Sequence, residues 1–224
     1  MKKRIKIDSA LLSSIIIVTG FLFAFRNLYP RNPFLDDVLD FFGFIVLLTG
    51  ILLRMSARGH KMARSDKSQK LVTTGPYTFV RNPMYLGSFL MGAGFILMVW
   101  PWWSLPIFAV LFYMRFKKEV VKEEEFLRTM APKSYDAYCE KVPRVFPSLD
   151  QLRKTKLKKI INLEEAFSTK EKRGLWGWSI LAVLLESLQE QLVFGETMPS
   201  HTTMIFLMAA IAFVVGFAYY RQKK

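Results

Sequence analysis

Residues 84–114 read MYLGSFLMGAGFILMVWPWWSLPIFAVLFYM, an apolar run without a single acidic or basic side chain. Pro101 interrupts this run, and proline breaks a helix because it lacks a backbone donor. Each half approaches the roughly 20 apolar residues that a helix needs to cross the hydrocarbon layer of a membrane. We therefore predict two membrane helices that are joined by a very tight turn at residues 100–103.

Four further apolar stretches extend this prediction to an all-α, polytopic membrane protein with about six transmembrane helices. They cover residues 10–25, 38–53, 175–194 and 202–220, and the stretch at 175–194 is apolar in its first half only. Hydrophobic residues make up 52% of the chain, and the mean hydropathy is +0.22. This composition excludes a disordered chain. The single cysteine, Cys139, excludes a disulfide scaffold.

The formal net charge of +14 has two possible origins, a nucleic-acid footprint or the cytoplasmic loops of a membrane protein. Thirty of the 32 Lys and Arg residues lie in the N-terminus, residues 54–81, residues 115–173 and the C-terminus. These segments are every second one along the chain, as the positive-inside rule requires. The pattern predicts an integral membrane protein (of the inner or cell membrane in a prokaryote) with both termini in the cytoplasm and no nucleic-acid partner.

We predict three parts along the chain: a membrane core at residues 1–150, a basic linker at 151–173 and a C-terminal helical hairpin at 174–224. In the linker, apolar side chains fall near one helical face with lysines around them. Such an amphipathic helix favours the surface of an anionic leaflet, so anionic lipids are expected partners. The sequence does not indicate the oligomeric state.

Two segments of the predicted cytoplasmic side are dense in polar groups. The first covers residues 75–87 and reads GPYTFVRNPMYLG. Its Gly-Pro pair favours a turn, and Asn82 and Pro83 suit the N-cap and the first position of a helix. Arg81, Asn82 and Tyr85 are therefore expected to gather at a helix start, where free backbone amides favour an anionic group.

The second segment covers residues 122–147 and reads KEEEFLRTMAPKSYDAYCEKVPRVFP. Its three adjacent glutamates cost electrostatic energy, which basic neighbours or a cationic ligand would relieve. The two histidines of the chain stand alone, and no Cys/His spacing predicts a metal site.

Taken in this order, the two segments resemble the isoprenylcysteine carboxyl methyltransferase and phospholipid N-methyltransferase superfamily. The shared pattern is Gly-Pro-Tyr-x-x-Val-Arg-[His/Asn]-Pro-x-Tyr-x-Gly, then Glu-Glu-x-x-Leu, then Tyr-x-x-Tyr-x-x-x-Val-Pro-Arg, over about residues 40–147. The resemblance implies a membrane enzyme with a cytoplasmic pocket for S-adenosylmethionine. It also implies methyl transfer to a lipophilic, membrane-embedded acceptor, either an isoprenylcysteine carboxylate-like group or a lipid.

The same resemblance implies the residues of the site. The catalytic set is Arg144, Asn82 and Tyr85. The cofactor pocket consists of Arg81, Asn82, Pro83, Tyr85, Gly87, Gly92, Gly94, Glu123, Glu124, Tyr135 and Tyr138. One departure is Asn82 in place of the commoner histidine, because an amide can form hydrogen bonds but cannot act as a base. Another is Ala131-Pro132, where Phe-Gly often precedes the paired tyrosines.

Each assigned group also has a structural alternative. The glutamates can solvate an exposed helix, with Glu125 the first candidate for that role. Gly92 and Gly94 can permit close packing of membrane helices instead of approach to an adenine ring. Tyr135 and Tyr138 can anchor the chain at the membrane interface, and Arg144 can bind lipid headgroups.

Two other functions remain open from the sequence. An NADPH-dependent membrane reductase of the sterol and steroid type shares the ending Tyr138-Cys139-x-x-Val142-Pro143. The paired glutamates and the position of Pro83 favour the methyltransferase over this reductase. The third possibility is a non-catalytic membrane protein, such as a small transporter or a scaffold.

Overall fold

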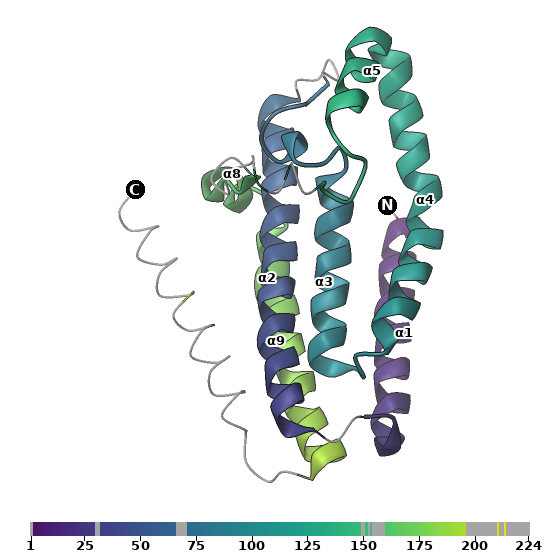
Figure 1. Ribbon diagram of the computed structural model, residues 1–224, viewed down its shortest axis with the longest axis vertical. Coiled ribbons are helices and arrows are strands. Elements are labelled where there is room, and N and C mark those ends of the chain that lie inside the picture. Colours follow the sequence, from purple (N-terminus) through teal and green to yellow (C-terminus); the bar gives the residue numbers. More distant parts are fainter. Residues whose placement is uncertain are drawn as a thin grey trace. The chain divides into compact units, whose positions relative to one another are not determined.

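The computed structural model describes residues 2–29, 32–65, 71–148, 151, 153, 160–195, 210 and 213. The described elements are helices, with no β-strand among these residues, so the all-α prediction is confirmed for this part of the chain. Figure 1 labels α1 (Lys2–Ala24), α2 (Pro33–Arg64), α3 (Pro83–Val99), α4 (Ser104–Met130), α5 (Pro132–Lys141), α8 (Leu163–Phe167) and α9 (Lys172–Gln189). Shorter turns are η1 (Arg26–Leu28), η2 (Gly75–Thr78) and the π-helical η3 (Glu190–Phe194).

The tight turn predicted at Pro101 is confirmed, because α3 ends at Val99 and α4 begins at Ser104. The Trp100 amide still donates to the Ile96 carbonyl at 2.9 Å, which completes the last turn of α3. The Ser104 hydroxyl donates to the Pro101 carbonyl at 2.7 Å and is buried. This serine therefore satisfies a carbonyl that the proline leaves outside both helices.

Two helices extend beyond their predicted apolar runs. α2 continues from the run at 38–53 as far as Arg64, because Met55, Ser56 and Ala57 carry its buried face onward. α4 continues past Met114 to Met130 as a charged helix. Several basic residues that the sequence pattern places in a loop after residue 53 therefore lie on helix α2.

The structure does not confirm the predicted six transmembrane helices. Among the described residues, the Phe34–Arg64 part of α2 is long and apolar enough to cross a membrane. Ser13–Ala24 and Pro83–Val99 are apolar but shorter. The predicted span at 202–220 lies outside the described residues, except for Ala210 and Phe213.

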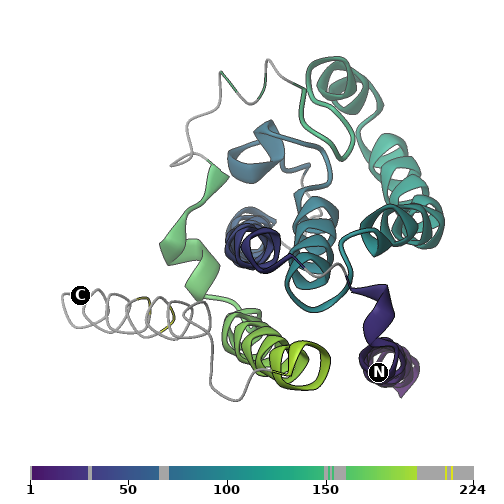
Figure 2. The same ribbon diagram turned by 60° about the horizontal axis from the view of Figure 1, so that its bottom comes forward.

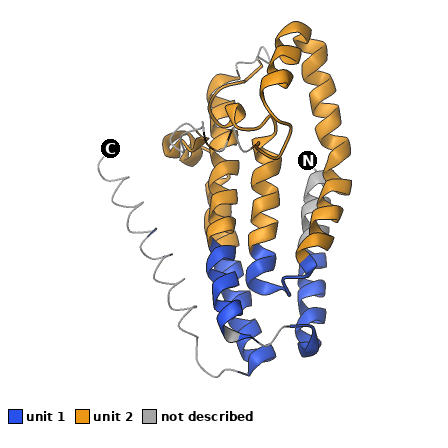
Figure 3. Ribbon diagram, in the orientation of Figure 1, with its two compact units in different colours: residues 1–44, 95–104, 180–224 blue, residues 45–94, 105–179 orange. Residues whose placement is uncertain are grey.

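The chain divides into two compact units, and each combines segments that are distant in sequence (Figure 3). Unit 1 contains residues 1–44, 95–104 and 180–224, and unit 2 contains residues 45–94 and 105–179. The division into a membrane core, a linker and a hairpin stays a prediction. The predicted basic linker at 151–173 lies partly outside the described residues, at 152 and 154–159.

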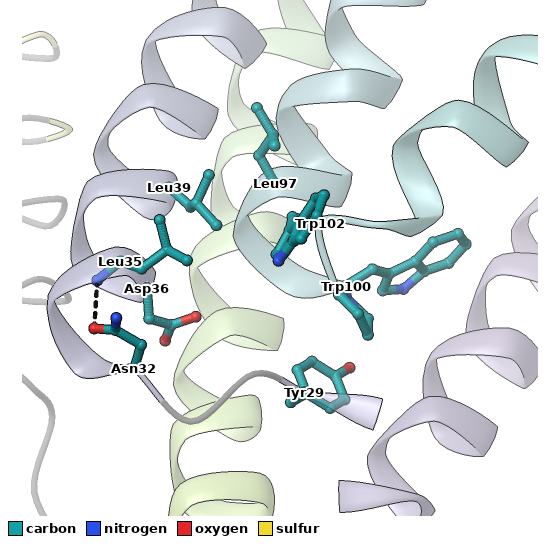
Figure 4. Close-up of a pocket in the computed structure, with 9 residues that line it drawn as sticks. Tyr29, Asn32, Leu35, Asp36, Leu39, Leu97, Trp100 and Trp102 are labelled. Atoms are coloured by element: carbon teal, nitrogen blue, oxygen red, sulfur yellow. Dashed lines mark hydrogen bonds between the residues drawn. The ribbon is translucent and has the colours of Figure 1, made fainter. Parts of the chain in front are cut away.

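Unit 1 is held together by aromatic side chains that donate hydrogen bonds. The Tyr29 hydroxyl donates to the Val99 carbonyl at 3.2 Å, and the Trp100 indole donates to Thr19 at 3.0 Å. Figure 4 shows Tyr29, Trp100 and Trp102 around a small pocket that Asp36 also lines. Its remaining lining residues are Asn32, Leu35, Leu39, Leu97 and Pro101.

Unit 2 is built on close helix packing at glycines. A Cβ atom on Gly87 of α3 would lie 2.7 Å from the Gly50 carbonyl oxygen of α2, so these two helices meet backbone to backbone. A Cβ atom on Gly92 would collide with the Phe108 ring of α4. α3 therefore lies beside α2 on one side and α4 on another, as Figure 1 shows.

Residues 160–171, which we call the strap, run along the end of α2 (Figure 2). The Ser56 hydroxyl of α2 donates to the Ile160 carbonyl at 3.0 Å. Glu165 of α8 pairs with Arg64 at 2.6 Å, and Glu171 pairs with Arg54 and Arg58, each at 3.2 Å. The strap is therefore fixed to α2 by hydrogen bonds and by two carboxylates.

The charge of Glu165 makes this attachment sensitive to acid. Burial alone would raise the pKa of Glu165, but the hydrogen bonds from Arg64 and His60 outweigh it and hold the pKa below the usual 4.5. A depressed carboxyl pKa stabilises the folded state above the unfolded-state pKa, and this stability is lost as the pH falls through the folded value.

We expect Glu165→Gln to lower the thermal midpoint of the chain at pH 7 by roughly 2–4 °C, which corresponds to about 1 kcal/mol. The difference from wild type should shrink as the pH falls from about 4.5 through the lower folded-state pKa of Glu165, at which the carboxylate itself becomes neutral. Thermal unfolding in detergent from pH 7 down to acid measures it. A difference that persists unchanged in acid would contradict the assignment of this charge.

Candidate functional site

The two polar segments singled out in the sequence meet at the start of α3. The backbone amides of Arg81 and Asn82 donate to the carbonyls of Pro143 and Arg144, at 2.8 and 3.0 Å. Asn82 precedes Pro83, the first residue of α3, as the sequence predicts. These hydrogen bonds fasten the residues after α5 to the turn before α3, although 62 positions separate Asn82 from Arg144.

Glu124 of α4 lies at the centre of the charges that gather here. Its side chain is only 10% exposed, and its Oε2 pairs with Arg144 Nη2 at 2.8 Å. Its Oε1 accepts from Asn82 Nδ2 at 3.1 Å and lies 3.8 Å from Arg81 Nη1. A buried carboxylate is stable only with such partners. Two cations, one amide and one carboxylate therefore form a connected cluster with excess positive charge.

Two polar atoms beside this cluster are buried without a hydrogen-bond partner of good geometry, Arg81 Nε and the Tyr135 hydroxyl. Arg81 uses Nη1 to donate to Cys139 Sγ at 2.5 Å. Burial, together with the Glu124 carboxylate, raises the pKa of Tyr135 well above its usual value, so its hydroxyl stays protonated. Such donors are rare in folded proteins, and each costs about 1–3 kcal/mol. These two atoms are therefore candidate donors to a polar ligand.

Tyr138 braces the turn that leads into the site. Its hydroxyl donates to the Tyr77 carbonyl of η2 at 2.6 Å. Burial raises the pKa of Tyr138 well above its usual value and keeps this donor protonated. Tyr138 also packs with Tyr135 and Val142 in one buried cluster. Its contacts in the structure are therefore structural.

Tyr85 and Glu123 form a second polar pair outside the charged cluster. The Tyr85 hydroxyl of α3 lies near the Glu123 carboxylate of α4. Glu123 is exposed, whereas the next residue, Glu124, is buried. Side chains of adjacent helix residues point in different directions. The carboxylates of Glu123 and Glu124 therefore lie on different sides of α4. Glu125 is exposed.

A row of aromatic rings continues from Tyr85 along α4. Phe108, Phe112 and Phe116 are four residues apart, and neighbouring ring centroids lie 5.7 and 4.4 Å from each other. The Tyr85 ring contacts Phe116 at 5.4 Å. Phe89 of α3 contacts Phe108 and Phe112 at 5.7 and 5.4 Å and Phe146 at 5.3 Å. We call these six rings the aromatic row.

The glycines of the predicted pocket have packing contacts in this structure. Gly87 lies against α2, Gly92 lies under Phe108, and Gly94 is buried. Pro83 begins α3 and is buried. Their predicted contact with a cofactor stays a prediction. The structure thus brings Arg81, Asn82, Glu124, Tyr135 and Arg144 together, and it places Tyr85 and Glu123 beside them as a separate pair.

Sequence reasoning missed three features of this region. The four-residue spacing of Phe108, Phe112 and Phe116 is a signal that predicts one helical face. Cys139, which the sequence analysis used only to exclude a disulfide scaffold, contacts Arg81. His60, interpreted as a lone histidine, hydrogen-bonds Glu165, and nothing in the sequence connects two residues 105 positions apart. His201 lies outside the described residues.

Comparisons with known proteins address the same region. The phospholipid methyltransferase family profile matches residues 38–133. This segment is therefore similar to the phospholipid methyltransferase family. The match confirms the resemblance predicted from the sequence over these residues, which contain the turn before α3 and the paired glutamates of α4. Tyr135, Tyr138 and Arg144 lie beyond the matched range.

Curated relatives agree with the family profile. A protein-S-isoprenylcysteine O-methyltransferase of Schizosaccharomyces pombe is 32% identical over 113 residues, which are 47% of each chain. A protein-S-isoprenylcysteine O-methyltransferase B of Arabidopsis thaliana is 29% identical over 114 residues, 47% of this chain and 58% of the relative. The chain therefore spans about half the length of the curated relatives it matches.

A third relative has a different name. The nickel-cobalt-cadmium resistance protein NccN of Alcaligenes xylosoxydans xylosoxydans is 32% identical over 87 residues, 39% of this chain and 40% of the relative. Within the described residues, no group of three His, Cys, Asp or Glu side chains is arranged to hold a metal ion. No solved structure gives a significant match.

Proposed function

We propose that this protein binds S-adenosylmethionine and transfers its methyl group to a lipophilic acceptor that enters from the membrane. The observation that carries the proposal is the cluster around Glu124, with its two buried donors that lack partners. The superfamily segment at 38–133 and the relatives named as O-methyltransferases support the same reaction.

The residues of the cluster fit the polar groups of this cofactor. The cofactor has an amino-acid carboxylate, an ammonium group and two ribose hydroxyls. Arg81 Nε and the Tyr135 hydroxyl are the donors that we assign to the carboxylate, because both lack acceptors. Glu123 is an exposed carboxylate that we assign to the ribose hydroxyls or the ammonium. Glu124 holds Arg81, Asn82 and Arg144 in position.

Methyl transfer requires that the acceptor be aligned with the methyl group of the cofactor, and it does not require a nucleophile from the protein. S-adenosylmethionine supplies a methyl group on a sulfonium, which is already a good leaving group. The task left to the chain is to hold the acceptor atom in line and close. Asn82 cannot act as a base, and an ionised carboxylate acceptor needs none. Arg144 is 53% exposed on its side chain, so its guanidinium can still hold an anionic acceptor.

We assign the apolar part of the acceptor to the aromatic row. These rings run from Tyr85, next to the cluster, along α3 and α4. Phe146, at the far side of Phe89, is 60% exposed and follows Arg144 by two residues. An apolar chain can therefore lie on the rings while its polar end reaches Arg144.

The membrane topology belongs to the same proposal. We infer about six transmembrane helices, with both termini and the site at the cytoplasmic face and with anionic lipids of that leaflet as partners. The support is the apolar stretch of α2 and the alternation of basic segments along the chain.

A binding titration tests the cofactor. We expect purified protein in nanodiscs to bind S-adenosylmethionine saturably, with competition by the demethylated product S-adenosylhomocysteine. NADPH serves as the second ligand, because the alternative reductase would bind it. Saturable binding of NADPH without binding of S-adenosylmethionine would overturn the proposal.

Tyr135→Phe tests whether the Tyr135 hydroxyl donates to the ligand or stabilises the fold. Removal of an unpartnered buried hydroxyl should leave the thermal midpoint of the protein unchanged or slightly higher. The same change should weaken S-adenosylmethionine binding about tenfold, because the ligand loses a hydrogen bond. Tyr138→Phe is the contrast: it removes the bond to the Tyr77 carbonyl and should lower the midpoint. Equal behaviour of the two variants would refute the assignment of Tyr135.

A further inference from the structure

His60 connects the strap to the turn before the site. It lies on α2, is 5% exposed, and uses both ring nitrogens. Nδ1 lies 2.7 Å from Glu165 Oε2 on the strap, and Nε2 lies 2.9 Å from the Thr74 hydroxyl. The donor and acceptor roles of the two ring nitrogens depend on the tautomer, because Nδ1 faces both the Glu165 carboxylate, which only accepts, and the Arg64 guanidinium, which only donates. The charged groups that face the ring are Glu165 from α8 and Arg64 from α2, whose Nη1 lies 2.8 Å from Nδ1.

The next residue of the turn, Gly75, packs on the same imidazole. Its φ is +60°, a conformation that favours glycine. A Cβ atom at Gly75 would lie 2.6 Å from His60 Nε2 and 2.7 Å from Nδ1. The Gly75 backbone thus packs against the His60 imidazole. The ring therefore determines the position and direction in which η2 begins.

The turn leads directly into the charged cluster. η2 covers Gly75–Thr78, and Arg81 and Asn82 follow within four residues. Between them, Phe79 and Val80 pack with Ile160, the first described residue of the strap, in one buried cluster. The strap therefore reaches the loop at two points, through the His60 ring and through Ile160.

We propose that His60 is a positioning residue through which the docked strap holds the loop at residues 74–82 in its ligand-binding shape. The strap lies beyond the segment that matches the methyltransferase family, so this support comes from a part of the chain that the family profile does not include. The effect on cofactor affinity rests on the proposed function, whereas the effect on the loop does not.

Three variants test the Glu165–His60 and His60–Thr74 contacts separately. Glu165→Gln weakens the strap end and does not touch the loop. His60→Gln places an amide near the position of Nε2 and so preserves the contact with Thr74. His60→Ala removes both contacts. Glu164→Gln removes the same charge from the neighbouring, exposed position of α8 and serves as the matched control.

Two readouts on the full chain in nanodiscs test the proposal. The first is hydrogen exchange of peptides covering residues 71–82 without any ligand. We expect about tenfold faster exchange in Glu165→Gln and in His60→Ala, partial rescue in His60→Gln, and wild-type exchange in Glu164→Gln. The second is titration with S-adenosylmethionine, with about tenfold weaker binding in the same two variants and little change in the turnover of saturated enzyme.

The outcomes distinguish the two claims. Wild-type exchange of residues 71–82 in both Glu165→Gln and His60→Ala would overturn the role of His60. Unchanged S-adenosylmethionine affinity despite a loosened loop would overturn its link to the cofactor. A wild-type protein that binds no S-adenosylmethionine would contradict the proposed function instead, while the exchange result would still decide whether His60 positions the loop.

Discussion

Glu124→Gln is expected to lower the rate of methyl transfer by about 100-fold, because one change removes the charge that holds two arginines and an amide together. Glu124 pairs with Arg144 at 2.8 Å and accepts from Asn82 at 3.1 Å. Glutamine keeps the size and can still accept from Asn82, but it leaves the guanidinium of Arg144 without its counter-ion. The measurement is transfer of labelled methyl groups by purified protein at saturating acceptor.

The three adjacent glutamates provide their own controls. Glu125→Gln removes the same charge from an exposed position one residue away and should leave transfer within twofold of wild type, about the scale of a surface charge. Glu123→Gln should weaken cofactor binding without disturbing the cluster. Equal losses in all three variants would indicate a general effect of charge on α4 and would contradict the central place of Glu124.

Gly87→Ala is expected to destabilise the chain by about 3 kcal/mol and to lower its thermal midpoint on the order of 10 °C. The new methyl group would lie 2.7 Å from the Gly50 carbonyl oxygen and 3.0 Å from the Arg54 backbone nitrogen. These are backbone atoms, so α2 and α3 must separate to admit it. Arg81 and Asn82 at the start of α3 should lose their geometry as a result.

Gly177→Ala is the matched control for this change. Gly177 lies within α9 and is exposed, and a methyl group there would meet no side chain and no other helix within 4 Å. Alanine at this position should be neutral or stabilise the helix by roughly 0.5–1 kcal/mol. Thermal unfolding of both variants in the same detergent gives the comparison. A midpoint of Gly87→Ala equal to that of Gly177→Ala would contradict backbone contact between α2 and α3.

Much of the local structure could be predicted because it depends on neighbouring residues. Pro101 and the apolar residues around it predict the turn between α3 and α4. Asn82 and Pro83 predict the start of α3. The superfamily pattern also predicts that the segments around residues 81 and 144 belong to one site, which the structure joins by backbone hydrogen bonds.

Other features depend on which side of a helix packs against the rest of the protein, and the sequence alone does not determine that side. Among three identical neighbours, only Glu124 is buried. Beyond residue 53, α2 packs against the strap, for example through the hydrogen bond from Ser56 to the Ile160 carbonyl. The strap lies about a hundred residues later in the sequence, so local patterns do not reveal this contact. The connection from Glu165 through His60 to Thr74 likewise exists only in the folded chain.

The most direct test of the whole account is methyl transfer itself. Purified protein in nanodiscs is incubated with methyl-labelled S-adenosylmethionine and total membrane lipid, and the lipid extract is then analysed for labelled product. We predict label in the lipid fraction, released by mild alkali as expected for the ester of a carboxylate acceptor, and its loss in Glu124→Gln. Absence of label from every lipid fraction, with protein that is folded and supplied with both substrates, would contradict the account.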